Sequence, residues 1–313
     1  MHVLIIGGTG FIGYHSCREL LSRGHQVTLM GLPPAPPAGL FPKGAKVRLA
    51  DLRELSDRQL QRALSPYDAV VFAAGADDRV TPTGPAYEFF YQANVRSTVR
   101  VTAAATRAGV EKLVLLGSYF TYFNREWPDM ALAEHHPYIM SRREQMELGA
   151  AVAGDDVAFI TLELPYIFGA MPGVVPLWDP LVRYVRSGVE LFYTRGGSNM
   201  IAVEHVAEAI AGACERIERS RVYQVGDRNV SWTALLQGLC AAAGREDDNV
   251  HIIADELVHN VGWIGEFVYR LQGREGGLQP SHLTHLQTAN AYFDPSASRR
   301  ALGYGRGGVE EAG

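Results

Sequence analysis

Hydrophobic positions in the first half of the chain fall into short apolar runs separated by stretches with helical spacing. The first run is HVLIIGG, residues 2–8, after which Ile12, Ser16, Leu20 and Leu21 repeat at helical spacing until Gly24. Five further runs follow along the chain: QVTLM, KVRLADL, DAVVFAAG, KLVLLGS and residues 158–164. Strands that alternate with helices predict parallel pairing, so we expect an α/β fold built on a doubly wound parallel sheet.

The alternation weakens after Pro165, which indicates a second, smaller lobe. Regular alternation returns only around 199–213 and 222–244. We predict that residues 1–165 form the main domain, that 199–222 return to it, and that 166–198 and 223–313 form a C-terminal substrate lobe. In that lobe, residues 257–271 are mostly apolar and predict a helix whose side with Val261, Ile264, Val268 and Leu271 packs into the core.

A glycine-rich turn, GGTGFIG, directly follows the first predicted strand and opens the first helix. Gly7, Gly10 and Gly13 are spaced G-x-x-G-x-x-G, with Phe11 and Ile12 between the last two. The first glycine permits a tight turn, the second lets the backbone approach a pyrophosphate, and the third allows close packing of helix on strand. Because a helix N-terminus offers free N–H groups to phosphate, the motif predicts nucleotide binding.

Composition and charge narrow the classes of partner. The net charge is -5, so there is no basic excess to bind a nucleic-acid backbone. Three widely spaced cysteines predict no disulfide framework, and no cluster of cysteine and histidine predicts a metal; His135-His136 is better explained as polar loop residues. No apolar run is long enough for a membrane span, so we expect a cytoplasmic protein without a membrane partner.

Taken together, the motifs resemble the extended short-chain dehydrogenase/reductase family, the NAD-dependent epimerase/dehydratase group, over nearly the whole chain. LPYIFG, residues 164–169, resembles the family's segment after the sixth strand, and DPSASRRALGY, residues 294–304, resembles its closing motif. The resemblance implies a Rossmann fold with a smaller C-terminal substrate lobe. It also implies that the cofactor contacts are Asp51 and Leu52 beside the adenine, then Ala73, Ala74, Gly75, Asn94, Pro165 and Ile167.

The type of dinucleotide stays open at the level of sequence. An acidic residue after the second strand would accept the adenine ribose hydroxyls, whereas an arginine there would meet a 2′-phosphate. This strand ends in Met30-Gly31-Leu32, which provides neither residue. NAD and NADP are therefore both expected cofactors.

The resemblance also implies an active site of serine, tyrosine and a basic residue. Ser118 ends the fifth strand, Tyr138 follows twenty residues later, and Arg142 occupies the position where the family has lysine. A phenol has a pKa near 10, so a cation one helical turn away is needed to stabilise its anion near neutral pH. Tyr138 and Arg142 would also contact the cofactor, and the serine hydroxyl would position the substrate oxygen.

Arg142 leaves two interpretations open. A guanidinium preserves the positive charge, but it is larger and flatter than an ammonium and does not release its proton. Lysine occurs at only three positions, Lys43, Lys46 and Lys112, among the 29 basic residues, so arginine here is also compatible with drift after lysine ceased to matter. Because Ser118 and Tyr138 both remain, we favour a working oxidoreductase.

The predicted function is hydride transfer between NAD(P) and an alcohol or ketone on a small, fairly apolar molecule. A nucleotide-sugar epimerase or dehydratase is the first alternative, since Arg183, Arg186, Arg195 and Arg270 are candidates to bind a second diphosphate. A non-catalytic NAD(P)-binding sensor or scaffold is the second. By resemblance, residues 93–108 and 138–153 would form the helices of a homodimer.

Overall fold

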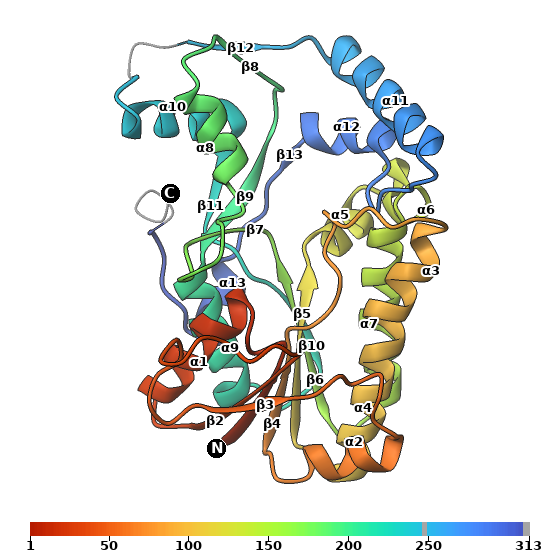
Figure 1. The fold of residues 1–313 in the computed structure, drawn as a ribbon, viewed down its shortest axis with the longest axis vertical. Coiled ribbons are helices and arrows are strands. Elements are labelled where there is room, and N and C mark those ends of the chain that lie inside the picture. The colour runs from red at the N-terminus through yellow and green to blue at the C-terminus, as the bar shows by residue number, and fades with distance from the viewer. Residues whose placement is uncertain (246–248, 309–313) are drawn as a thin grey trace.

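The protein is built on a seven-stranded parallel sheet with the order β10-β6-β5-β4-β1-β2-β3 (Figure 1). Every neighbouring pair in this sheet runs parallel. The computed structural model describes residues 1–245 and 249–308. The strand order reverses direction between β1 and β4, and this switch point is where doubly wound sheets bind ligands. The α/β fold class predicted from the sequence is confirmed.

The six predicted strands of the first domain are all present in this sheet, and the segment 221–224 adds a seventh. The strands are β1 His2–Ile6, β2 Gln26–Gly31, β3 Lys46–Leu49, β4 Ala69–Phe72, β5 Lys112–Ser118, β6 Ala158–Leu164 and β10 Arg221–Gln224. Residues 32–44 lie outside regular elements, as expected for a loop. The apolar runs therefore located the sheet, because strands covered on both faces are continuously apolar. The edge strand β3 is the exception, since its four residues are exposed.

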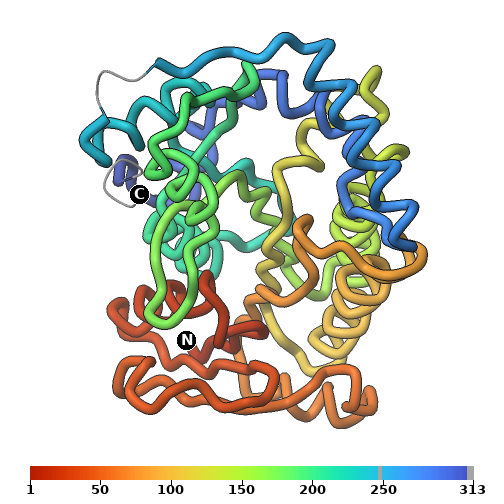
Figure 2. The backbone as a smooth tube through the Cα atoms, turned by 45° about the horizontal axis from the view of Figure 1, so that its top comes forward, coloured from red at the N-terminus to blue at the C-terminus, as the bar shows by residue number. Residues whose placement is uncertain are grey.

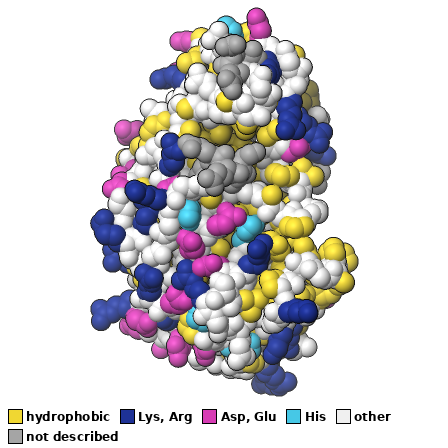
Figure 3. Space-filling model, turned by 90° about the vertical axis from the view of Figure 1, so that its left-hand side faces the viewer, with side chains coloured by type: hydrophobic (Ala, Val, Ile, Leu, Met, Phe, Trp, Pro, Cys, Tyr) yellow, Lys and Arg dark blue, Asp and Glu magenta, His cyan; other side chains and the backbone are white. Residues whose placement is uncertain are grey.

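Helices cover both faces of the sheet (Figure 1). One face carries α1 Phe11–Ser22, α9 Val203–Arg216 and α13 Ser296–Leu302; the other carries α2 Asp57–Leu64, α4 Ser97–Ala108 and α7 Pro137–Ala153. A π-helical segment, Tyr91–Arg96, joins α3 Ala86–Phe90 to α4. On the side of the molecule shown in Figure 3, basic and acidic side chains are interspersed.

The remaining elements form the region above the carboxyl ends of the strands (Figures 1 and 2). Strand β9 pairs with β7, β11 and β13, and β8 pairs with β12. The strands are β7 Tyr166–Phe168, β8 Leu191–Tyr193, β9 Gly197–Ala202, β11 Arg228–Ser231, β12 Val250–Ile252 and β13 Asn290–Ala291. The helices are α5 Phe120–Glu126, a 3₁₀ turn Pro128–Met130, α6 Leu132–His135, α8 Asp179–Arg186, α10 Trp232–Ala242, α11 Asp255–Leu271 and α12 Pro280–Thr288.

Within the predicted returning segment 199–222, only the later part joins the main sheet region. Strand β9 belongs to the smaller sheet, whereas α9 packs beside α1 and leads to β10. The division into a main domain and a substrate lobe stays our proposal. Residues 246–248 and 309–313 of the proposed lobe lie outside the described residues.

The helix predicted at 257–271 exists as α11, but the prediction of which face packs into the core is wrong. Ile264 is 64% exposed and Leu271 is 72% exposed. The helix instead packs through Gly262 and Glu266, where a Cβ on Gly262 would come within 2.6 Å of the Pro280 carbonyl oxygen. Because a glycine permits this close approach to α12, the small-residue face is buried and the apolar face is left outside.

No helix in the described part of the chain combines the length and the apolar character that crossing a membrane requires.

Candidate active site

A cavity of about 590 Å³ opens at the carboxyl ends of the strands, where β1 and β4 lie side by side. Its size lies within the usual range for a small-molecule or cofactor site. Thirteen of the sixteen residues predicted for the site line this one cavity. They are Gly7, Gly10, Phe11, Ile12, Gly13, Ala73, Ala74, Gly75, Ser118, Tyr138, Arg142, Pro165 and Ile167.

The glycine turn has the geometry that its spacing predicts. Gly7 adopts a positive φ of 81°, and a Cβ there would lie 2.6 Å from the Ala73 carbonyl oxygen on the neighbouring strand end. A Cβ on Gly13 would lie 2.6 Å from the Cα of Gly8, so helix α1 packs directly against the turn. By contrast, a Cβ on Gly10 would meet no protein atom closer than 3.4 Å. The space beside Gly10 therefore belongs to the cavity.

These features fit a dinucleotide phosphate. Gly10 is the N-cap of α1 and provides no side chain to satisfy the first N–H groups of the helix. Such unpaired donors at a helix N-terminus bind phosphate readily. The segment after β7 descends beside α1, where the His15 ring nitrogen Nε2 lies 2.9 Å from the Ala170 carbonyl oxygen (Figure 2). It closes one side of the cavity.

The serine and tyrosine predicted for catalysis lie together. Ser118 is the last residue of β5, and Tyr138 is the second residue of α7, directly after Pro137. Proline suits this first helical position because its missing N–H would have no partner there. The Ser118 hydroxyl is hydrogen-bonded to the Tyr138 side chain, and both are nearly buried in the protein.

Arg142 lies one turn further along α7, and its guanidinium faces the Tyr138 ring. It is held there by two hydrogen bonds: Nη2 donates to the Leu116 carbonyl at 3.1 Å, and Nη1 donates to Gln145 at 2.6 Å. Its Nε is buried without a hydrogen-bond partner in the described residues. The cation is thus fixed beside the tyrosine, and its Nε–H is left unused.

Opposing effects act on the pKa of Tyr138. Burial is the largest and raises the pKa above its ordinary value, while the positive charge of Arg142 lowers it. The negative charge of Asp78 raises it again, and the hydrogen bond with Ser118 lowers it. The net shift is upward, so the phenol is protonated at neutral pH in the protein without bound ligands.

Three predicted cofactor residues, Asp51, Leu52 and Asn94, lie outside the cavity wall. The Asp51 carboxylate accepts hydrogen bonds from the backbone and side chain of Arg53. Asn94 is buried behind the wall, where Oδ1 accepts from the Ala76 N–H at 2.9 Å and Nδ2 donates to the Ser141 hydroxyl at 3.2 Å. Asn94 therefore ties the turn after β4 to helix α7; its contact with the cofactor stays a prediction.

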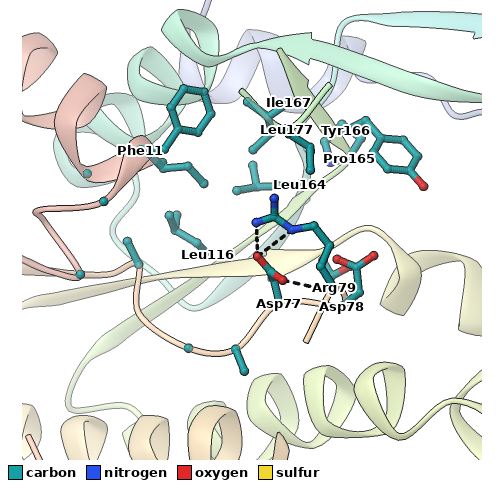
Figure 4. Close-up of a pocket in the computed structure, with 18 of the residues that line it drawn as sticks. Phe11, Asp77, Asp78, Arg79, Leu116, Leu164, Pro165, Tyr166, Ile167 and Leu177 are labelled. Atoms are coloured by element: carbon teal, nitrogen blue, oxygen red, sulfur yellow. Dashed lines mark hydrogen bonds and ion pairs between the residues drawn. The ribbon is translucent and has the colours of Figure 1, made fainter. Parts of the chain in front are cut away.

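Sequence reasoning missed a charged stretch in the loop after β4. Asp77, Asp78 and Arg79 all line the cavity, and Arg79 forms an ion pair with Asp77 (Figure 4). Their position was available from the rule that residues at strand carboxyl ends face the site. Figure 4 also shows apolar side chains around them, including Leu116, Leu164, Ile167 and Leu177.

Residues between α11 and α12 form hydrogen bonds with the start of α7. The Tyr138 N–H donates to the Gly277 carbonyl at 2.9 Å, and the Gln279 N–H donates to Nδ1 of His136 at 3.0 Å. Burial lowers the pKa of His136 to about 3, so this ring stays neutral and remains an acceptor. These bonds hold the backbone of Tyr138 in place.

Comparison with known proteins agrees with this geometry. The model of the NAD-dependent epimerase/dehydratase family matches residues 3–226. Sterol-4-alpha-carboxylate 3-dehydrogenase, decarboxylating, of Homo sapiens is 28% identical over 230 residues, which is 69% of this chain and 58% of that protein. UDP-glucose 4-epimerase 3 of Oryza sativa subsp. japonica is 30% identical over 151 residues, 44% of this chain and 40% of that protein.

Among solved structures, the crystal structure of gox2253 superposes with a TM-score of 0.79 at 23% identity. The match covers 99% of this chain and 94% of that one. This likeness concerns the fold, including the region above the strand ends. The family match confirms the resemblance inferred from the sequence motifs.

Proposed function

The chain belongs to the NAD-dependent epimerase/dehydratase family, and from that premise we propose that it transfers a hydride between a nicotinamide dinucleotide and an alcohol or ketone on a small, fairly apolar molecule. The observation that carries the proposal is the meeting of Ser118, Tyr138 and Arg142 in one cavity with the glycine turn. The nicotinamide supplies hydride chemistry when bound, and the protein supplies position and proton transfer. NAD and NADP both remain candidates.

Tyr138 is the proton-transfer group in this proposal. During alcohol oxidation its phenolate accepts the hydroxyl proton, and during ketone reduction its hydroxyl donates a proton to the carbonyl oxygen. The Ser118 hydroxyl orients the substrate oxygen beside Tyr138. Arg142 stabilises the phenolate through its charge, and it cannot exchange the proton itself because a guanidinium stays protonated.

The cavity wall supports an apolar substrate over a nucleotide sugar. Beyond Tyr138 the wall includes Tyr166, Met171, Leu177 and Trp178, which are apolar or aromatic. None of the arginines considered for a second diphosphate lines this cavity, and three of them form ion pairs elsewhere. The pairs are Arg183 with Asp179, Arg195 with Asp255 and Arg270 with Glu266.

Turnover with a cofactor and an alcohol panel tests the proposal. Purified protein is supplied with NAD⁺ or NADP⁺ and a set of secondary alcohols, and reduced cofactor is followed by absorbance. Tyr138→Phe is expected to lower kcat by about 10²- to 10⁴-fold, the usual contribution of a positioned acid–base group. Tyr223→Phe, outside the cavity on β10, is the matched control and keeps the parent rate.

The alternatives give different results in the same assay. Conversion of a UDP-sugar to its epimer without net cofactor reduction would establish an epimerase. This is the second candidate because one of the relatives is a UDP-glucose 4-epimerase. Cofactor binding without turnover of any alcohol, unchanged by Tyr138→Phe, would establish the sensor and overturn hydride transfer.

We also propose a homodimer that pairs through α4 and α7. These helices lie side by side on one face of the sheet (Figure 1). On α7, Leu148 and Val152 are large apolar side chains that are more than one-third exposed. Pairing with a second copy would cover them.

A further inference from the structure

The two adjacent aspartates of the cavity differ in their partners. Asp77 is paired with Arg79, whose Nε donates to its carboxylate at 3.1 Å. In the described part of the chain, Asp78 forms no ion pair and accepts no side-chain hydrogen bond; its carboxylate is bonded to its own backbone N–H. Asp78 is therefore a carboxylate in the cavity wall without a side-chain partner among the described residues.

The surroundings of Asp78 make an ionised carboxylate without a side-chain partner energetically unfavourable. It lies within electrostatic reach of three tyrosine hydroxyls, those of Tyr119, Tyr138 and Tyr166. Burial is the main cause that raises the pKa of Asp78, with repulsion from Asp77 next. A partly buried carboxylate in a cavity wall is stabilised by a donor or a positive charge.

The protein's own cations are engaged elsewhere. Arg79 is bonded to Asp77, and Arg142 donates to Leu116 and Gln145. Both arginines act on Asp78 through space, without a hydrogen bond to its side chain. The free acceptor positions of Asp78 therefore remain available to a molecule that enters the cavity beside Tyr138.

We propose that Asp78 determines substrate specificity by accepting a hydrogen bond from a donor group, a hydroxyl or a protonated amine, close to the carbon that is oxidised or reduced. This inference rests on the proposed hydride transfer at Tyr138 and names the class of substrate. The substrate is an otherwise apolar alcohol or ketone that carries a second polar group with a hydrogen to donate. The apolar wall receives its body, and Asp78 receives this group.

The same contact would assist the reaction. The charge of Asp78 opposes ionisation of Tyr138, so an unpaired Asp78 works against the phenolate that oxidation requires. A donor on the substrate shields that charge. Substrates with the donor thus bind more tightly, and they also favour ionisation of Tyr138. Substrates without the donor have neither effect.

Matched six-membered alcohols test the inference: cyclohexanol, trans-1,2-cyclohexanediol and trans-2-aminocyclohexanol. Binding to NAD⁺-loaded protein is measured by ligand-observed NMR, and NADH formation is measured in parallel. The parent should bind the diol, the amino alcohol or both about 10- to 100-fold more tightly than cyclohexanol, as expected for a hydrogen bond to a charged group. Preference for the amino alcohol alone assigns the donor as an ammonium.

Asp78→Ala should bind the three compounds with similar affinity, Asp78→Asn should keep only a reduced preference through its amide oxygen, and both should still bind NAD⁺. Asp156→Asn, an exposed acid between α7 and β6, is the matched control and should keep the parent preference. Equal affinity of the parent for all three compounds, including no measurable binding, overturns the inference, as does a preference that survives Asp78→Ala. Selective binding without any NADH formation would overturn hydride transfer while supporting recognition by Asp78.

Discussion

The guanidinium carbon of Arg142 lies 5.5 Å from the centre of the Tyr138 ring. The two side chains therefore face each other, although the arginine donates its hydrogen bonds to Leu116 and Gln145 and none to the phenol oxygen. The arrangement preserves the charge of a catalytic pair without the direct contact that a more compact ammonium could make. A working site, not a remnant, therefore stays our prediction.

Arg142→Gln and Arg142→Lys separate the effect of the positive charge at this position from the effect of the side chain's shape. Since Arg142 lowers the pKa of Tyr138, its removal raises that pKa, and the rise of alcohol oxidation with pH should move to higher pH. At neutral pH the Gln variant should lose about 10- to 100-fold in kcat, because the phenolate loses the stabilisation of a nearby positive charge. The Lys variant should keep the parent pH profile. Rates across a pH series provide the measurement.

Arg186→Gln, on the exposed side of α8, is the control for this series and should change neither rate nor profile. An unchanged profile in Arg142→Gln would contradict an electrostatic role for Arg142.

Replacing glycine by alanine at two positions of the glycine turn should have two different effects, one on stability and one on NAD⁺ affinity. Gly13→Ala places a Cβ against the Gly8 backbone, so the free energy of unfolding should fall by about 1–3 kcal/mol. Gly10→Ala meets only Gly7 at 3.4 Å, so the fold should persist while NAD⁺ affinity falls about 10- to 100-fold. Urea unfolding and calorimetric titration measure the two effects.

Gly238→Ala is the control, because a Cβ there meets no atom within 4 Å and α10 gains a better helix former. Loss of stability in Gly10→Ala as large as in Gly13→Ala would argue that the open space beside Gly10 is structural.

Asn94→Ala should loosen the loop that carries Asp77 and Asp78. The substitution leaves the Ala76 N–H without its acceptor, which costs about 1–3 kcal/mol for a buried group left unsatisfied. It also removes the bond to the Ser141 hydroxyl, which keeps its bond to the Tyr138 carbonyl. Stability should fall in urea unfolding, and turnover should fall at temperatures where the variant is still folded. Asn260→Ala, on the exposed side of α11, should change neither.

How much the sequence could predict depends on how local each signal is. The apolar runs and the glycine turn are local, so they located the sheet and the phosphate end of the cavity. Asp78 was missed because no spacing rule selects it, although residues directly after a parallel strand are expected at the edge of the sheet that faces the site. The prediction of the buried face of α11 was wrong. Close packing of Gly262 against α12, and not hydrophobic periodicity, decided which side is buried.

The proposed dimer predicts that charge on α7 separates the subunits. Leu148→Lys adds a cation to an apolar position that a second copy would cover, and two such charges would meet across a symmetric interface. The parent should sediment as a dimer at micromolar concentration, and this variant as a folded monomer. Leu271→Lys, on the more exposed face of α11, is the matched control and should remain dimeric. The reverse result, dissociation by Leu271→Lys alone, would place the interface on α11 and remove α4 and α7 from it.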